Sequence, residues 1–212
     1  MARCANNRQE VKRAVVIGAS AGGIEALPQV ISRLPSDFPW PLIIAVHLLR
    51  SKESNLAEFL DKKSYMRVFE ARSGDLPQPG TAYLAPSNYH LLVEDDLSLS
   101  LSIDEPVNFS RPSIDVLFES AADALGPDLI AVILTGANSD GAEGMRRAKE
   151  LGALTIVQDP KEAKMQIMPE RAIAATKIDH ILPLREIAPL LIALAEKEGW
   201  KSKRDLNAMS DG

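Results

Sequence analysis

The architecture of this chain of 212 residues can be worked out from one stretch, VVIGASAGGIEAL, at residues 15–27. It begins as a β-branched apolar run, passes through six small residues, and continues with the spacing of an amphipathic helix. A buried strand that turns sharply into a helix is the repeating unit of a doubly wound α/β sheet. Ser20 lies in the middle of the glycine-rich turn, where it can act as a nucleophile, contact a phosphate or cap the helix.

The alternation of strand and helix continues along the chain. Short apolar runs, of the kind buried on both faces of a parallel sheet, lie at residues 14–17, 42–46, 129–135, 154–157 and 180–182. Amphipathic helices are predicted at residues 23–34, 55–63, 113–125, 141–151 and 184–199. On the first of these helices the expected buried face comprises Ile24, Leu27, Val30, Ile31 and Leu34. The pattern predicts a sheet that is buried on both faces by helices.

Residues 81–103 interrupt this alternation. Their alternating side chains around Asp95 and Asp96 predict an antiparallel hairpin attached to one edge of the sheet. The predicted fold class is therefore α/β: a doubly wound, mostly parallel sheet flanked by helices, with an antiparallel hairpin near one edge.

Composition excludes several classes of protein. The formal net charge of -5 gives no general attraction for nucleic acid. The single cysteine, Cys4, cannot form an internal disulfide, which favours a reducing, cytoplasmic setting. No apolar run approaches the roughly 18 residues that a membrane span needs, and the polar first dozen residues lack the hydrophobic segment of a signal peptide. We expect a cytoplasmic protein that neither binds nucleic acid nor inserts into a membrane.

Three polar residues follow three different predicted strands. Ser20 follows the first strand, His47 the second, and Asp140 lies in the turn after the strand at residues 129–135. Ligand sites in open parallel sheets lie beyond the carboxyl ends of the strands, so these side chains are expected to converge. Together they supply a nucleophile, a base and a carboxylate that orients the base.

The spacing around the serine supports acyl-transfer chemistry. Residues 18–22 have the G-x-S-x-G pattern of a sharp strand-to-helix turn, in which small neighbours leave the hydroxyl exposed. Backbone N–H groups near Ala21, together with the turn at Ala137 and Asn138, are candidates to hold the oxyanion that forms during such a reaction.

Other interpretations of these residues remain open from the residues alone. Ser20 and Asp140 are both of types that cap helices, and a single histidine at a strand end is often structural. His47 is nevertheless the only histidine placed to serve Ser20, because His90 belongs to the hairpin and His180 opens a late strand at the opposite edge. The dinucleotide fingerprint G-x-G-x-x-G is absent, and the histidines lack the spacing of metal ligands. We therefore expect no cofactor and no metal.

Several separated blocks resemble one family. IGASAGG, the strand ending in AVH, FSRPSIDVLF, VILTGANSDGAEGM and MPERA occur in the order and spacing of the catalytic domain of the CheB-type chemotaxis-receptor protein-glutamate methylesterases. The resemblance spans roughly residues 13–194. It implies a cytoplasmic serine hydrolase of chemotaxis signal transduction that demethylates γ-glutamyl methyl esters on chemoreceptor helices, and that in some members deamidates glutamines. It assigns the nucleophile to Ser20, the histidine to His47 and the aspartate to Asp140.

The resemblance also defines expectations about domains and partners. Residues 1–12 are expected to be a polar leader, 13–198 a single methylesterase-like α/β domain, and 199–212 a polar tail, with no receiver domain in this chain. The expected partners are the cytoplasmic domain of a methylated chemoreceptor and a separate receiver domain. Arg111 is expected either to contact an acidic receptor surface or to form a salt bridge inside the domain.

Departures from the family pattern leave two alternatives. Many members have threonine at the position of Ala21 and methionine at that of Ala137, so the cleft of this chain has room for another substrate. The same fold can therefore serve a small-molecule esterase, or a module that binds a signalling partner without catalysis.

Overall fold

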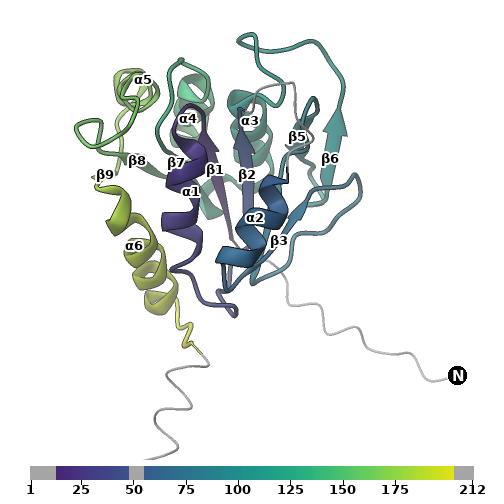
Figure 1. The fold of residues 1–212 in the computed structure, drawn as a ribbon, viewed down its shortest axis with the longest axis vertical. Helices are drawn as coiled ribbons and strands as arrows, with labels where there is room; N and C mark the ends of the chain where they lie inside the picture. Colours follow the sequence, from purple (N-terminus) through teal and green to yellow (C-terminus); the bar gives the residue numbers. More distant parts are fainter. Residues whose placement is uncertain (1–12, 48–54, 203–212) are drawn as a thin grey trace, which may run out of the picture.

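The computed structural model describes residues 13–47 and 55–202. Within them the chain forms one sheet of seven strands, in which every neighbouring pair is parallel (Figure 1). In spatial order the strands are β3 (Arg67–Glu70), β4 (Thr81–Leu84), β2 (Leu42–Val46), β1 (Ala14–Ala19), β7 (Leu129–Ile133), β8 (Leu154–Gln158) and β9 (His180–Leu182). The doubly wound α/β class predicted from the sequence is confirmed.

Helices cover both faces of this sheet (Figure 1). One face packs against α1 (Gly23–Ile31), α2 (Leu56–Lys63) and α6 (Leu184–Lys197). The other packs against α3 (Ile114–Leu125), α4 (Ala142–Glu150) and α5 (Ile167–Ala175). Successive side chains of a strand point to opposite faces, and β1 accordingly supplies Val15 and Ile17 to one core and Val16 to the other. All six residues of β1 are buried, as expected for the central strand.

The direction of chain progression reverses at the centre of the sheet. β1 pairs with β2 on one side and with β7 on the other, so the helices that follow β1 and β7 leave toward opposite faces. A crevice forms at the carboxyl ends of strands at such a switch point. The turns after β1, β2 and β7 therefore surround one place on the molecule.

Small residues bring the chain close together at this place. A Cβ on Gly18 would lie 2.4 Å from Ile114 Cγ2, which shows how closely the end of β1 approaches the start of α3. Gly22, two residues after Ser20, is the N-cap residue of α1. Its φ of 88° is a left-handed conformation that favours glycine. The glycine-rich turn is thus required by the backbone path as well as by any chemistry at Ser20.

The region predicted as one hairpin divides into two parts. β4 lies inside the main sheet, paired in parallel with β2 and β3, whereas β5 (His90–Val93) and β6 (Leu99–Ser102) form a separate two-stranded antiparallel sheet. This second sheet packs its apolar side chains, Leu91 among them, against α3 rather than hydrogen bonding to an edge strand. The sequence pattern missed β3, with its single buried residue, and α5.

Two further details concern the surface and the end of the described chain. Ile24, expected on the buried face of α1, is 49% exposed, because it lies in the first turn next to the carboxyl edge of the sheet. Trp200 packs edge-on against Phe38 and donates a hydrogen bond from Nε1 to the carbonyl of Asp37.

The predicted leader at residues 1–12 and most of the predicted tail lie outside the described residues. In the described part of the chain, no helix is both long and apolar enough to cross a membrane.

Candidate active site

Backbone hydrogen bonds fix the three strand ends relative to one another. The N–H of His47 donates to the carbonyl of Ala19 at 3.1 Å, and the N–H of Ser20 donates to the carbonyl of Thr135 at 2.9 Å. The first bond extends the β1–β2 ladder one residue beyond Val46, and the second extends the β1–β7 ladder two residues beyond its last pair, Gly18 and Ile133. The positions of Ser20 and His47 therefore follow directly from strand register.

The side chains of Ser20, His47 and Asp140 form one hydrogen-bonded chain. His47 Nε2 lies 2.7 Å from Asp140 Oδ2, and His47 Nδ1 lies 3.1 Å from Ser20 Oγ. Since a carboxylate only accepts hydrogen bonds, the proton of the neutral imidazole belongs on Nε2. Nδ1 then carries the lone pair, and the Ser20 hydroxyl donates to it. This is the state in which a histidine can act as a base toward a serine.

Asp140 is fully buried and receives hydrogen bonds at both carboxylate oxygens. Besides His47, Oδ2 accepts from the N–H of Ile114 at 2.7 Å. Oδ1 accepts from Ser113 Oγ at 2.8 Å and from the N–H of Asp115 at 3.1 Å. Asp140 therefore does not cap the helix that follows it, as its position next to Gly141 also allows; its carboxylate binds the N-terminus of α3. The partial positive charge of that helix end stabilises the ionised carboxylate.

A second carboxylate, that of Asp115 in α3, accepts hydrogen bonds from the start of α4. Its Oδ1 accepts from the N–H groups of Gly141 and Gly144 at 2.8 and 2.7 Å, so it binds the N-terminus of α4. The amide of Asn108 bridges the two acids, donating to Asp115 Oδ2 at 2.8 Å and to Asp140 Oδ1 at 3.2 Å. Asp140 thus binds the N-terminus of α3, whose first turn contains Asp115, and Asp115 binds the N-terminus of α4, which follows Asp140, so that Asp140 is fixed opposite His47.

The pKa values of the two acids shift in opposite directions, although burial raises both. Burial raises the pKa of Asp115 to about 6, with the negative charge of Asp140 acting in the same direction against partial compensation by the Gly144 N–H. Burial also opposes ionisation of Asp140, but hydrogen bonds from His47, Ile114 and Ser113 outweigh it and lower the pKa to about 2. Asp140 is therefore the member of the pair that stays ionised over the whole neutral range.

Donors for a developing negative charge surround the serine. The N–H groups of Ala21, Ala137 and Asn138 find no acceptor in the part of the chain that the structure describes, and Ala21 and Ala137 are exposed. The Asn138 side chain lies beside them, with its Nδ2 3.3 Å from His47 Nδ1. The backbone N–H groups suit the anionic oxygen that forms when Ser20 attacks a carbonyl group.

The other histidines serve different purposes. The imidazole of His90 is buried, accepts a hydrogen bond from the N–H of Ser113 at Nδ1, and contacts the carbonyl of Glu105 through Nε2. It joins the hairpin to the start of α3. His180 begins β9, where it pairs with Ile156 in the middle of β8 rather than lying at the amino edge expected from the sequence, and three strands separate it from β2. No cluster of three or more His, Cys, Asp or Glu within residues 13–47 and 55–202 could hold a metal ion.

Sequence reasoning missed the residues that support Asp140. Asp115, Asn108 and Ser113 are near in sequence to one another but 25 or more residues from Asp140, so no local spacing connects them to it. One local signal was present: Ser113 directly precedes an apolar helix, as a capping residue does, and its Oγ accepts from the N–H of Val116.

A doubly wound sheet whose switch point holds a serine, a histidine and a buried aspartate in hydrogen-bonding order has the arrangement of the serine hydrolases. Comparison with known proteins defines the group further. The family model for CheB methylesterase matches residues 15–191, and the chain belongs to this family.

Individual relatives agree with this assignment. A putative protein-glutamate methylesterase/protein-glutamine glutaminase of Leptospira interrogans is 48% identical over 181 residues, which cover 85% of this chain and 94% of that protein. The protein-glutamate methylesterase/protein-glutamine glutaminase of Nitrosospira multiformis is 39% identical over 193 residues, which cover 91% of this chain but 54% of that relative. The crystal structure of the Thermotoga maritima CheB methylesterase catalytic domain matches with a TM-score of 0.82 and 34% identity, covering 86% of this chain and 98% of that one.

Proposed function

We propose that this chain is a protein-glutamate methylesterase and protein-glutamine glutaminase that acts on the cytoplasmic helices of chemoreceptors. The observation that carries the proposal is the hydrogen-bonded series Ser20–His47–Asp140 at the switch point of a CheB-family fold. The two bonds run in the order that base-assisted attack by serine requires. The enzyme works in the cytoplasm, where the substrate helices lie.

In the acylation step the Ser20 oxygen attacks the carbonyl carbon of a γ-glutamyl methyl ester. His47 Nδ1 takes the hydroxyl proton while Nε2 keeps its own proton and its bond to Asp140. The carbonyl oxygen becomes negatively charged and is bound by the N–H groups at Ala21 and at the turn of Ala137. The tetrahedral intermediate then collapses, His47 protonates the departing methoxide, and methanol leaves a glutamyl ester of Ser20.

In the deacylation step the same residues act on water. His47 removes a proton from a water molecule as it attacks the acyl carbon, and then returns that proton to Ser20 Oγ. The product is a free γ-carboxylate on the receptor. A glutamine substrate follows the same path with ammonia as the leaving group, which accounts for the glutaminase activity in the same site.

Asp140 acts through His47 rather than on the substrate. Its ionised carboxylate keeps the proton on Nε2 and stabilises the imidazolium that forms after proton transfer. The donors from α3 keep this carboxylate ionised and fixed in place, so the geometry exists before the substrate arrives.

The proposal is tested by methanol release from a methylated chemoreceptor cytoplasmic fragment. The wild-type chain should release methanol, and the Ser20→Ala variant should not, while circular dichroism shows the same fold for both. Ser139→Ala is the matched control, because Ser139 lies in the adjacent turn, is exposed and takes no part in the hydrogen-bonded series. Release by Ser20→Ala at the wild-type rate would refute the role of Ser20. Hydrolysis of small esters with no release from receptor would instead show a small-molecule esterase.

A further inference from the structure

An apolar side chain stands exposed beside the site, in the loop between β6 and α3 (residues 103–113, the β6–α3 loop). Phe109 is 99% exposed, and the same loop exposes Ile103 at 72% and Val107 at 38%. Figure 1 shows this loop rising above the carboxyl edge of the sheet at the top of the view. Scattered single apolar side chains on a surface are ordinary, but here three lie within seven residues of one loop.

The backbone of the loop holds Phe109 outward. Asn108 and Phe109 have φ of 51° and 60°, a left-handed conformation that bulky residues rarely adopt. The Asn108 side chain points inward and donates to Asp140 Oδ1 and Asp115 Oδ2. Its neighbour is thereby directed to solvent. Backbone strain of this kind persists where the surrounding contacts enforce it, and it gathers at functional sites.

Arg111 braces the same loop. Its guanidinium donates to the carbonyls of Ile103 and Asp104, and on its other side to Asn88 Oδ1 at 2.9 Å. Of the two roles expected for Arg111, the internal salt bridge is absent among the described residues; the guanidinium instead ties the two ends of the loop to the turn before β5. A loop braced at its ends and hydrogen bonded at Asn108 presents Phe109 in one position, which lowers the entropy cost of binding through it.

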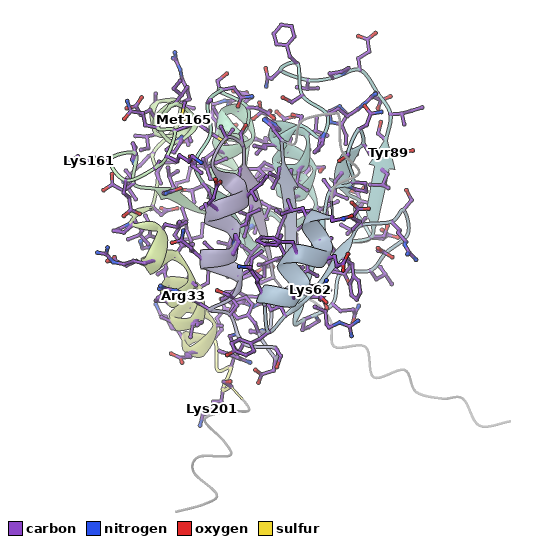
Figure 2. The ribbon with its side chains drawn as sticks, in the orientation of Figure 1. Arg33, Lys62, Tyr89, Lys161, Met165 and Lys201 are labelled. Atoms are coloured by element: carbon purple, nitrogen blue, oxygen red, sulfur yellow. The ribbon has the colours of Figure 1, made fainter. Side chains whose placement is uncertain are left out.

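Exposed apolar side chains also lie on the other side of the site. Ile24 at the start of α1 is 49% exposed, and Met165 and Ile167 near the start of α5 are 38% and 40% exposed. Figure 2 shows Met165 and Tyr89, which is itself 40% exposed, at opposite sides of the upper part of the molecule. The carbonyl of Met165 accepts from the N–H of Gly136, so this flank adjoins the turn that carries Ala137.

We propose that Phe109 anchors the receptor helix that carries the substrate glutamate, a proposal that rests on the function proposed above. A helix is a rod about 10–12 Å across with its side chains. When an ester on such a helix reaches Ser20, the turns before and after that residue lie over the protein surface on both sides of the site. Its apolar side chains at intervals of three and four residues would pack against Phe109 on one flank and Met165 on the other.

Charge favours the methylated form of such a helix. The exposed charged side chains of the β6–α3 loop near Phe109 are those of two acids, Asp104 and Glu105. The guanidinium of Arg111, the third charged side chain of the loop, is hydrogen bonded to the Asp104 carbonyl and to Asn88. Methyl esters are neutral, whereas the product glutamates are anionic and are repelled by these acids. The loop would therefore bind substrate in preference to product.

The experiment compares Phe109→Ala with wild type on two substrates: a methylated receptor cytoplasmic fragment and 4-nitrophenyl acetate. Truncation of a large anchoring side chain at an interface raises KM for the receptor fragment by roughly tenfold or more, with kcat little changed. Kinetics on 4-nitrophenyl acetate stay at the wild-type values, because Phe109 takes no part in the chemistry. The effect persists at high salt because the contact is apolar.

Two controls make the result specific. Phe69→Ala makes the same substitution at a phenylalanine that is 43% exposed on the edge strand β3, and it should leave both substrates unaffected. Phe109→Leu keeps an apolar side chain and should restore most of the affinity. In the Ser20→Ala background, Phe109→Ala should weaken binding of the fragment by the same factor as KM.

Two results would overturn the proposal. An unchanged KM for the receptor fragment in Phe109→Ala would show that the helix does not touch this loop, whose exposed phenylalanine would then serve another protein such as a receiver domain. Equal losses on both substrates would show an effect on the site itself. Absence of methanol release by the wild-type chain, with 4-nitrophenyl acetate still hydrolysed, would refute the proposed function and the anchor together.

Discussion

Replacing Asp140 with asparagine should damage catalysis far more than stability. The carboxylate is fully buried, and both of its oxygens accept from donors that include the backbone N–H groups of Ile114 and Asp115. An amide offers one acceptor and one donor, so in either orientation one of these N–H groups faces an NH₂ group. A buried donor left without a partner costs ~1–3 kcal/mol, and we expect Asp140→Asn to lose about 2–4 kcal/mol of stability, the upper end including the weakened bond to His47.

The effect on rate depends on the tautomer of His47. With the amide NH₂ toward His47, Nε2 becomes the acceptor, the proton moves to Nδ1, and His47 cannot take the proton of Ser20. The same substitution in serine proteases lowers kcat by about 10⁴. We expect kcat to fall by roughly 10³–10⁴ on receptor and small esters alike, measured by methanol release and by ester hydrolysis.

Asp179→Asn is the matched control for this experiment. Asp179 accepts from the N–H and Oγ1 of Thr155 and pairs with Lys149 at the opposite edge of the sheet, so its replacement also weakens a carboxylate network. It should lower the melting temperature while kcat stays near the wild-type value. Wild-type kcat in Asp140→Asn, or an equal loss in both variants, would refute the argument from tautomer control.

Acid unfolding offers a further check on the same residue. The pKa of Asp140 lies below its ordinary 3.8, at about 2, so its contribution to stability is complete above pH 3.8 and is lost as the pH falls through 2. The difference in unfolding free energy between wild type and Asp140→Asn should therefore be constant near neutrality and shrink between about pH 4 and pH 2. A difference that does not change with pH would contradict ionisation of Asp140 in the folded protein.

Three other outcomes follow from neighbouring residues. The pKa of Asp115 is raised from 3.8 to about 6, so its effect on stability has the opposite pH dependence from that of Asp140. Its stabilising contribution is full below pH 3.8 and is lost as the pH rises through 6. Urea unfolding should therefore show a smaller loss of stability from about pH 4.5 to 7 in Asp115→Asn than in wild type. Gly144→Ala would place a Cβ 2.5 Å from Phe118 Cβ, and the resulting separation of α3 from α4 should cost ~1–3 kcal/mol in thermal unfolding and lower kcat; an unchanged melting temperature would contradict the close packing. Arg111→Ala should loosen the ends of the β6–α3 loop, so that limited proteolysis there becomes faster and KM for the receptor fragment rises, while 4-nitrophenyl acetate kinetics change little because Asn108 keeps its bonds to Asp115 and Asp140.

The sequence was sufficient to predict the parts of the fold that obey local periodicity. β1, β2, β7 and β8 are short, largely buried apolar runs, whereas β9 is an edge strand whose residues are only half-buried or exposed, contrary to the expectation of burial on both faces. The bounds of all five agree with the predicted runs to within two residues. β3 escaped prediction because Val68 is its only buried residue, so it carries no apolar run. α5 was missed because its buried residues, among them Met168 and Pro169, make no clear amphipathic stripe.

The candidate site was predictable to the extent that strand ends determine it. Ser20, His47 and Asp140 each follow a strand, and the parallel sheet brings those ends together without further information. The support for Asp140 was not predictable, because it depends on how α3 and α4 cross. Asp115 reaches the N-terminus of α4 only through the close contact at Gly144, which is a property of packing and not of local sequence.

The most direct test of the account is to trap the acyl group on the chain. A methyl-ester substrate peptide is mixed with enzyme, the reaction is quenched in acid, and the protein is digested and analysed by mass spectrometry. The proposed mechanism predicts a glutamyl adduct on the peptide that contains Ser20, absent in Ser20→Ala and in His47→Ala. An adduct on another residue, or full turnover in Ser20→Ala, would contradict it.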